Sequence, residues 1–314
     1  MQTRNLGRSG LRVSAIGLGC NNFGGRIDLE ATRRVIHKAL DLGITLFDTA
    51  DTYGDRGGSE EAIGSILGDA RKRIVLATKF GNPMDDHGVK LGGSRRYIMQ
   101  AVDDSLRRLR TDWIDLYQMH QPDPRTPIDE TLRALDDLIR SGKVRYIGCS
   151  NFPAWQMVEA EWTAKSSGLS AFISCQDEYS LLVRNVVEPE LRAAMLRYGL
   201  GLLPFFPLAS GLLTGKYHRN APPPPGTRLA TTERLAERYL SEHNLSIVEQ
   251  LESFATERGH TLLEAAFSWL LARAPVASVI AGATRPEQLE ANVKAGDWTL
   301  SEEEVAEIGR IAAQ

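Results

Sequence analysis

Short apolar runs rich in β-branched residues alternate with longer amphipathic segments along most of this chain, at a pitch of about 30 residues. Eight of these runs are predicted to be strands, at residues 13–19, 44–50, 74–80, 114–120, 144–150, 171–177, 200–206 and 277–283. Two intervening segments, 95–110 and 127–142, are predicted helices. The second begins at Pro127 and stops at Gly142, residue types that suit a helix start and a helix end.

Regular alternation of this kind is typical of parallel βα units. An open doubly wound sheet would show the same alternation, but the count of eight strands favours a closed (β/α)8 TIM barrel, which needs about 250 residues. The chain has 314 residues, which leaves room for an N-terminal extension and for an insertion at roughly 209–260, after the seventh strand. We therefore predict one barrel domain spanning residues 1–314.

Composition excludes several other classes of function. The net charge of −3 gives no basic footprint for nucleic acid, and no apolar run is long enough to span a bilayer. The N-terminus lacks the apolar core of a secretory signal. The three cysteines, Cys20, Cys149 and Cys175, are odd in number and have no metal-like or C-x-x-C spacing. We expect a cytoplasmic protein without a metal site, and the oligomeric state is open.

Chemistry in such barrels takes place where strands end and loops begin. At seven consecutive predicted strand ends the residues are polar, aromatic or glycine, while the runs behind them are apolar. These residues are Asp48 and Tyr53, Lys79, His120, Ser150 and Asn151, Gln176, Phe205 and Phe206, and Gly282. The sequence therefore predicts a binding rim at one end of the barrel.

Four of these residues stand in recognisable contexts: FDTADTYG (47–54), ATKFG (77–81) and YQMHQPD (117–123). These segments resemble the catalytic tetrad signatures of the aldo-keto reductases. Four further segments resemble that family's cofactor-binding segments, in order: GCSNF (148–152), QDEYSLL (176–182), FFPLASGLLTGKY (205–217) and AGATRPEQLEANV (281–293). The first 25 residues resemble its opening hairpin and first strand. Within the family the chain is most similar to the bacterial-type general reductases and the potassium-channel β subunits.

The resemblance implies a (β/α)8 barrel with an N-terminal β-hairpin, NADPH as cofactor and reversible reduction of carbonyl compounds. A carbonyl accepts hydride readily only when its oxygen receives a proton or a strong hydrogen bond. We assign Tyr53 as that acid and expect the Lys79 ammonium to lower its pKa toward the working pH. Asp48 would pair with Lys79, and His120 would orient and polarise the carbonyl or share in proton relay. Asp51 is assigned to a turn or cap.

Taken singly, each of these residues has an ordinary structural interpretation. A tyrosine after a strand is usually a packing group, a buried Asp–Lys pair is often structural, and a lone histidine is more often a satisfied loop residue. Their joint occurrence at neighbouring strand ends, in motif context, favours the tetrad.

No dinucleotide fingerprint supports the cofactor assignment, because Asn22 stands where GLGCNNFGG would need its third glycine. Loops after the last two barrel strands, with a helix N-terminus, offer another phosphate site. Arg285, which precedes the helix-starting Pro286, suits a 2′-phosphate and favours NADPH over NADH. The predicted cofactor contacts are Ser150, Asn151, Gln176, Phe205, Pro207, Leu208, Ser210, Gly211, Lys216, Gly282, Thr284, Arg285, Gln288 and Asn292.

Two of these contacts depart from the family pattern. Phe205 falls where the family usually has a stacking tyrosine, and Gln288 occupies a position that is arginine in some relatives. The predicted substrate pocket is formed by Phe23, Tyr53 and His120, with walls from the 82–94 loop and from 217–239. Small aldehydes, including aromatic and dicarbonyl compounds, are the expected substrates.

Two other functions stay open at this stage. One is a regulatory subunit of the channel β type that binds NADPH and turns over slowly. The other is a barrel aldolase that uses Lys79 as a Schiff-base nucleophile, since a lysine at a strand end also suits that role.

Overall fold

The computed structural model of the chain describes residues 1–313. Eight parallel strands form one sheet in the order β10-β3-β4-β5-β6-β7-β8-β9. The strands are β3 (Ile16–Gly19), β4 (Leu46–Asp48), β5 (Val75–Phe80), β6 (Ile114–Met119), β7 (Val144–Ser150), β8 (Ser174–Glu178), β9 (Gly201–Phe205) and β10 (Val279–Gly282). The two outer strands meet through Leu202, whose N–H donates to the Pro275 carbonyl and whose carbonyl accepts from the Ala277 N–H. The predicted barrel is therefore confirmed.

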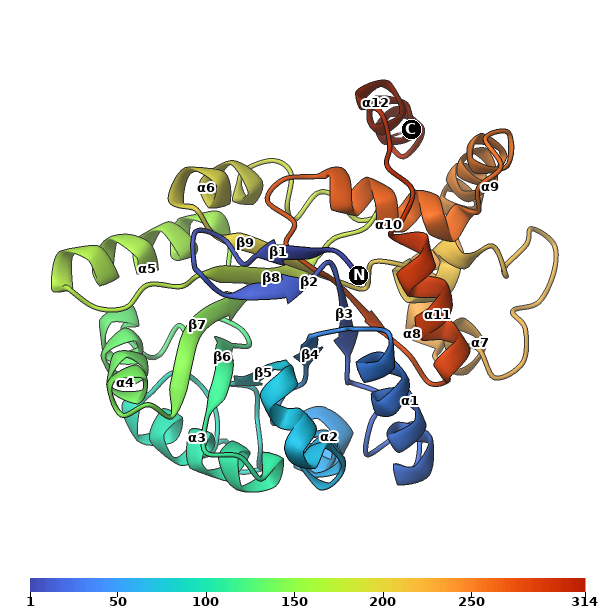
Figure 1. The fold of residues 1–314 in the computed structure, drawn as a ribbon. Helices are drawn as coiled ribbons and strands as arrows, with labels where there is room; N and C mark the ends of the chain where they lie inside the picture. Colours follow the sequence, from blue (N-terminus) through green and yellow to red (C-terminus); the bar gives the residue numbers. More distant parts are fainter. Residues whose placement is uncertain (314) are drawn as a thin grey trace.

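A ring of helices surrounds the strands (Figure 1). The helices that follow the strands are α1 (Leu29–Asp41), α2 (Tyr53–Leu67), α3 (Arg95–Leu109), α4 (Ile128–Arg140), α5 (Ala154–Ser167), α6 (Leu191–Tyr198), α10 (Leu262–Ala272) and α11 (Pro286–Ala295). An apolar stripe covers the buried side of α4, where Leu132, Leu135 and Leu138 recur every three residues. The predicted starts at Arg95 and Pro286 match the structure, and α4 begins one residue after the predicted Pro127.

The N-terminal hairpin lies across one end of the barrel (Figure 1). It pairs β1 (Thr3–Asn5) with β2 (Arg12–Ser14) in antiparallel register. Leu6 and Val13 are fully buried and belong to the apolar cluster of the barrel interior, together with Leu46 and Leu116. The first predicted strand, 13–19, is therefore divided: residues 13 and 14 pair with β1, and the barrel strand starts only at Ile16.

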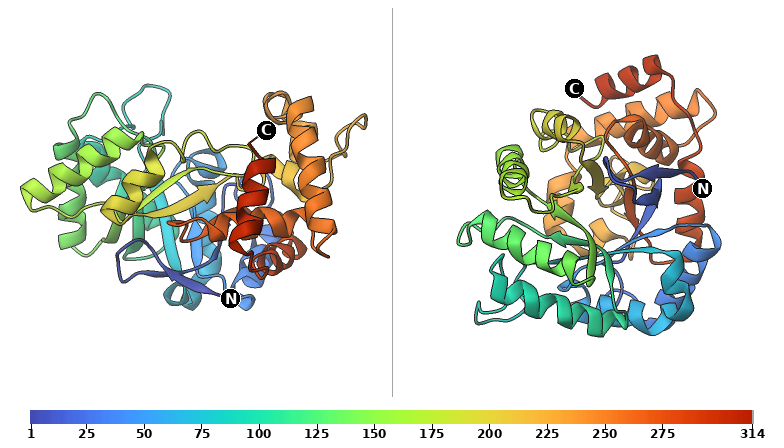
Figure 2. Two further views of the ribbon diagram at one scale, coloured as in Figure 1. Left: turned by 90° about the horizontal axis from the view of Figure 1, so that it is seen from above. Right: turned by 60° about the vertical axis from the view of Figure 1, so that its left-hand side comes forward.

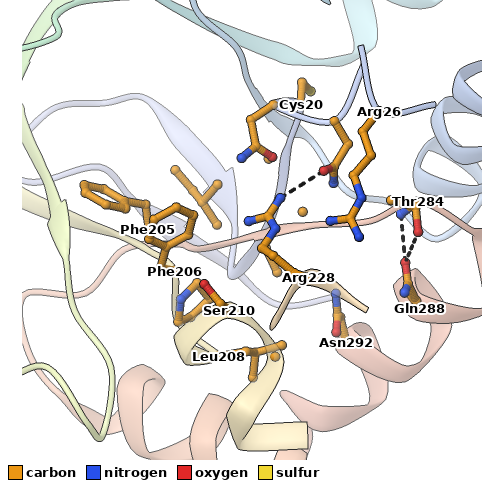
Figure 3. A pocket seen from close by; sticks show the side chains of 18 of the residues that line it. Cys20, Arg26, Phe205, Phe206, Leu208, Ser210, Arg228, Thr284, Gln288 and Asn292 are labelled. Atoms are coloured by element: carbon orange, nitrogen blue, oxygen red, sulfur yellow. Dashed lines mark hydrogen bonds between the residues drawn. The ribbon is translucent and has the colours of Figure 1, made fainter. Parts of the chain in front are cut away.

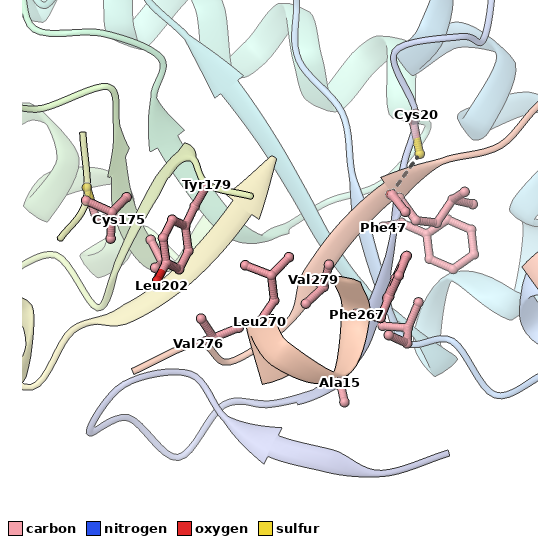
Figure 4. Close-up of a cluster of buried hydrophobic side chains, with 14 of the residues drawn as sticks. Ala15, Cys20, Phe47, Cys175, Tyr179, Leu202, Phe267, Leu270, Val276 and Val279 are labelled. Atoms are coloured by element: carbon pink, nitrogen blue, oxygen red, sulfur yellow. Dashed lines mark hydrogen bonds between the residues drawn. The ribbon is translucent and has the colours of Figure 1, made fainter. Parts of the chain in front are cut away.

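The larger apolar cluster fills the layer between strands and helices. Figure 4 shows the part of it around β10 and α10, including Val279, Phe267 and Leu270. Complete burial of a large apolar side chain contributes roughly 1.5–3 kcal/mol. The barrel is thus held by two apolar layers, one inside the strands and one outside them.

The insertion after β9 carries four short or peripheral elements: η2 (Ala209–Thr214), α7 (Arg228–Thr231), α8 (Glu233–Tyr239) and α9 (Glu242–Thr256). The C-terminal helix α12 (Glu302–Ile311) packs on α9 and α10 at the outer edge of the molecule (Figure 2). Among residues 1–313, no helix combines the length and apolar character that a membrane span requires.

Candidate active site

Asp48 and Lys79 end two neighbouring barrel strands, β4 and β5. Lys79 Nζ lies 2.7 Å from Asp48 Oδ2 and donates a second hydrogen bond to the Thr49 carbonyl at 2.9 Å. Its third neighbour is the Tyr53 hydroxyl, at 3.4 Å. Lys79 has no exposed surface at all, and a buried ammonium is tolerated only when it is paired and hydrogen-bonded. The barrel interior therefore holds a charged pair in contact with a phenol.

Tyr53 is held at the mouth of the barrel by an unusual turn at the start of α2. Gly54, Asp55 and Arg56 have φ values of 69°, 56° and 63°, so the chain winds in the left-handed sense just after Tyr53. At Gly54 a Cβ would lie 2.6 Å from the Phe23 carbonyl oxygen, so glycine alone fits there. The Tyr53 ring meets the His120 ring edge to face, with centroids 5.8 Å apart.

The electrostatics of the Tyr53–Lys79 pair differ in part from the sequence expectation. Burial raises the pKa of Tyr53, and the nearby Lys79 ammonium, which acts in the opposite direction, does not fully offset it. The net pKa is therefore above the ordinary phenol value rather than below it. Burial would lower the pKa of Lys79, but Asp48 and Tyr53 outweigh it and the pKa is raised. Lys79 is thus a cation at neutral pH and Tyr53 is a protonated phenol.

His120 follows β6 and lies on the other side of Tyr53. Burial, followed by the Lys79 charge, lowers its pKa to about 3, so the imidazole is neutral. Its Nδ1 is buried and has no hydrogen-bond partner among the described residues. The Asn151 side chain donates to the His120 carbonyl at 2.9 Å and to Ser150 Oγ at the same distance. His120 also lines the cavity described below, where a neutral imidazole can donate its ring N–H to a ligand oxygen.

The second oxygen of Asp48 accepts two amides. Gln176 Nε2 lies 2.9 Å from Asp48 Oδ1, and Gln118 Nε2 lies 3.1 Å from it. Gln118 is not among the site residues predicted from the sequence. The available signal was an amide between Tyr117 and Met119 in the run of β6, which has to find a partner inside the barrel.

Asp51, which we assigned to a turn or cap, is also buried. Its backbone N–H donates to the Lys79 carbonyl, and its Oδ2 accepts from the Tyr97 hydroxyl at 3.3 Å. Burial, followed by the charge of Glu60, raises its pKa to about 8. The side chain therefore packs between the barrel and α3, behind the Asp48–Lys79 pair, and does more than close a turn.

A cavity of about 920 Å³ opens at this end of the barrel. Asp48, Tyr53 and His120 line it, whereas Lys79 lies behind them. All fourteen predicted cofactor contacts also line it: Ser150, Asn151, Gln176, Phe205, Pro207, Leu208, Ser210, Gly211, Lys216, Gly282, Thr284, Arg285, Gln288 and Asn292. The structure thus brings three of the four tetrad residues and the residues of four distant segments to one cavity, with Lys79 directly behind its wall.

Figure 3 shows how the cavity is arranged. Phe205 and Phe206 lie at one end of the view, Thr284 and Gln288 lie at the other, and Arg228 lies between them. Gln288 Oε1 accepts from the Thr284 N–H at 2.7 Å and so caps the start of α11. One wall therefore presents aromatic rings and the opposite wall presents a capped helix N-terminus.

Four cations line the cavity: Arg26, Lys216, Arg228 and Arg285. Within residues 1–313 none of them forms an ion pair with a carboxylate. Burial, followed by the charges of Arg26, Arg285 and Arg228, lowers the pKa of Lys216. Cations that repel one another and lack counter-ions favour an anionic ligand with more than one charge.

Two of these cations, Arg26 and Arg228, are not predicted by any sequence motif. Arg228 donates to Asn22 Oδ1 at 3.0 Å, and Arg26 donates to the Gly226 carbonyl at 3.4 Å. These contacts join the loop after β3 to the insertion across the cavity, a meeting of distant segments that no local pattern reveals. Asn22, which stands in place of the third glycine of a dinucleotide fingerprint, accepts the hydrogen bond that holds Arg228.

Backbone and hydroxyl groups on the β9 side also fit a bound phosphate. Gly211 has a φ of 97°, and a Cβ there would lie 2.9 Å from Lys216 Nζ. Ser210 Oγ is buried in the cavity wall without a hydrogen-bond partner among the described residues. An unpartnered hydroxyl beside a free ammonium is a suitable cradle for phosphate oxygens. The residues present therefore fit a phosphorylated dinucleotide such as NADPH.

Two of the predicted substrate walls need correction. The Phe23 ring is fully buried in the apolar core and does not line the cavity, because its backbone carbonyl, rather than its ring, faces the Tyr53 turn. None of residues 82–94 lines the cavity either, and Asp86 of that loop pairs with Arg56. The insertion does contribute, through Pro225 to Arg228.

Comparison with known proteins agrees with this geometry. Residues 15–313 match the aldo/keto reductase family. The L-glyceraldehyde 3-phosphate reductase of Escherichia coli strain K12 is 38% identical over 98% of this chain and 91% of its own length. A probable voltage-gated potassium channel subunit beta of Arabidopsis thaliana is 38% identical over 95% of the chain and 92% of its own. The uncharacterized oxidoreductase YrpG of Bacillus subtilis strain 168 is 38% identical over 96% and 93%.

These matches extend over the barrel strands, the tetrad positions and the segments that line the cavity. The chain therefore belongs to the aldo/keto reductase family, whose members are oxidoreductases that use NAD(P)H.

Proposed function

We propose that this oxidoreductase reduces aldehydes and ketones to alcohols with NADPH, and that Tyr53 is the general acid. The observation that carries the proposal is the contact of the Tyr53 hydroxyl with Lys79 Nζ, at 3.4 Å, at a cavity that also presents four cations without a carboxylate partner in residues 1–313. The family match supports the class of reaction.

The cofactor would be held along the cavity. Lys216, Ser210 and the Gly211 backbone suit the pyrophosphate, and Arg285 suits the 2′-phosphate that distinguishes NADPH from NADH. Phe205 offers a ring on which the nicotinamide can stack, while Ser150, Asn151 and Gln176 offer hydrogen-bonding groups for its carboxamide. NADPH supplies the hydride that reduces the carbonyl carbon.

Side chains of the protein would carry out the proton transfer. Tyr53 donates its hydroxyl proton to the carbonyl oxygen as negative charge develops there, and Lys79 stabilises the phenolate that remains. Asp48 keeps Lys79 charged and fixed. His120 lines the cavity beside Tyr53, and its neutral imidazole would orient the carbonyl oxygen by donating a ring N–H hydrogen bond.

The substrate would be a small carbonyl compound without a phosphate group, such as an aromatic or dicarbonyl aldehyde. In this assignment the four cavity cations serve the phosphates of the cofactor. No cation other than Lys79 is in contact with Tyr53 among the described residues, and Lys79 is sequestered behind it. A panel that includes glyceraldehyde with and without a 3-phosphate tests this, because preference for the phosphate ester would contradict it.

A regulatory role is the second candidate, since relatives named as potassium channel β subunits are 38% identical to this chain. Such a protein would bind NADPH and turn it over slowly while a partner docked elsewhere. Steady-state NADPH oxidation at about 1–10³ s⁻¹, the usual range for enzymes, favours the reductase. Tight NADPH binding with no turnover of any carbonyl compound favours the regulator.

The aldolase interpretation requires Lys79 to attack a carbonyl as a neutral amine. Its raised pKa and its three contacts, with Asp48, Thr49 and Tyr53, oppose that role. Borohydride trapping of an aldehyde on Lys79 in the absence of nicotinamide would revive it.

A further inference from the structure

Gln118 places a neutral amide inside the barrel, behind the residues that line the cavity. The side chain has no exposed surface, and it lies on β6 two residues before His120. A buried amide is costly unless its donors and acceptors are satisfied. Gln118 satisfies both ends: its Nε2 donates to Asp48 Oδ1 at 3.1 Å, and its Oε1 accepts from Gln176 Nε2 at 3.4 Å.

Strand β7, which lies between Gln118 on β6 and Gln176 on β8, leaves space for the contact between the two amides. Gln118 of β6 is in register with Gly148 of β7, and Gln176 lies on β8, one strand further. A Cβ at Gly148 would lie 3.3 Å from Gln118 Cγ and 2.5 Å from Ser174 Oγ. The missing side chain at Gly148 therefore allows the Gln118 amide to reach across β7.

The surrounding acceptors determine which way each amide points. An ionised Asp48 only accepts hydrogen bonds, so both glutamines must turn their NH₂ groups toward Oδ1. Gln176 directs its Nε2 to Asp48 Oδ1 at 2.9 Å and also to Gln118 Oε1. Both N–H groups of Gln176 are then used, and its Oε1 is the atom left for the cavity that Gln176 lines.

We propose that Gln118 is a positioning residue that locks the Gln176 amide with its oxygen toward the cavity, and so links the nicotinamide site to the Asp48–Lys79 pair. The inference rests on the proposed use of NADPH. The Gln176 oxygen would accept a hydrogen bond from the carboxamide NH₂ of the nicotinamide. Gln118 does not line the cavity, and therefore it acts only through Gln176 and Asp48.

The test separates the two ends of the cofactor. Gln118→Met keeps the length and volume of the side chain but removes both hydrogen bonds. NADPH carries the nicotinamide, whereas 2′,5′-ADP carries only the adenosine with its 2′- and 5′-phosphates. The dissociation constants of both ligands are measured by fluorescence or calorimetry, so the readout does not depend on turnover.

We expect Gln118→Met to weaken NADPH about tenfold, the effect of losing a buried hydrogen bond, and to leave 2′,5′-ADP unchanged. Equal weakening of both ligands, or of neither, would overturn the role of Gln118. Tyr117→Phe is the matched control, because Tyr117 is the neighbouring β6 residue and its buried hydroxyl has no partner among the described residues. This control should bind both ligands as the unmodified protein does.

Gln118→Glu provides a conservative rescue. The introduced carboxylate would repel Asp48 when ionised, but once protonated it can donate to Asp48 Oδ1 and accept from Gln176. NADPH affinity of this variant should therefore rise as the pH falls, while that of the unmodified protein follows no such trend. If the ratio of the two NADPH affinities, variant to unmodified protein, does not change with pH, the inference is contradicted. Failure of the unmodified protein to bind NADPH would instead remove the proposed function itself.

Discussion

Lys79 Nζ lies 2.7 Å from Asp48 Oδ2, and neither side chain has more than a trace of exposed surface. A carboxylate at the end of a buried strand is thus explained by the ammonium that follows on the next strand. Burial of these two charges costs desolvation energy, and burial of an apolar pair of similar volume would not carry that cost. We interpret it as a device that keeps a cation beside the Tyr53 hydroxyl.

Breaking the pair should be destabilising. Asp48→Asn leaves the buried Lys79 ammonium without a counter-ion, and we expect the free energy of unfolding to fall by about 3–5 kcal/mol. Denaturant titration measures this. The double variant Asp48→Asn with Lys79→Met removes both charges and should recover much of the loss, but its turnover should stay low because Tyr53 has lost its cation. Recovery of turnover in the double variant would contradict the role of Lys79.

The pH profile of reduction should lack an acidic limb from His120. Its pKa is lowered to about 3, so the imidazole stays neutral from pH 5 to 8. Tyr53 has to be protonated to act as the acid, and its pKa is raised; the rate is therefore present below that pKa and lost only at alkaline pH above it. We expect kcat/KM to be flat between pH 5 and 8. An inflection near pH 6.5 that disappears in His120→Gln would show a titrating imidazole instead.

Arg285 should set the preference between the two cofactors. It is exposed at the start of α11, beside the Thr284–Gln288 cap. Arg285→Ala should weaken NADPH by about tenfold, the effect expected for a lost charge-assisted hydrogen bond, and should leave NADH nearly unchanged. Arg197→Ala, at an exposed arginine of α6 that is not among the cavity residues, is the control. A uniform loss for both cofactors would assign the 2′-phosphate to other residues.

The sequence could predict features that depend on local pattern. The periodicity of strands and helices predicted all eight barrel strands. Asp48 and Lys79 could be predicted to lie side by side because they stand at the ends of the neighbouring strands β4 and β5. The features that the sequence could not predict depend on tertiary packing. The boundary between β2 and β3 requires the β1 partner, and Arg228 reaches the cavity only because the insertion folds back onto Asn22. The pKa of Tyr53 follows from its burial, which motif context does not report.

Phe23 is a residue that the sequence predicted in the pocket wall but that packs in the apolar core. Its position after β3 suggested a pocket wall, but the ring turns into the core while the adjacent Asn22 faces the cavity. Which of two neighbouring residues faces a cavity depends on the loop conformation. Gln118 was missed for a related reason, since its partners lie on β4 and β8.

The role of Tyr53 as proton donor is tested by NADPH oxidation over a panel of small aldehydes, with the unmodified protein and with Tyr53→Phe. The variant keeps the ring but loses the proton, so turnover should fall by at least about 10²-fold while the NADPH dissociation constant changes little. Equal rates for the two proteins would show that Tyr53 is not the proton donor.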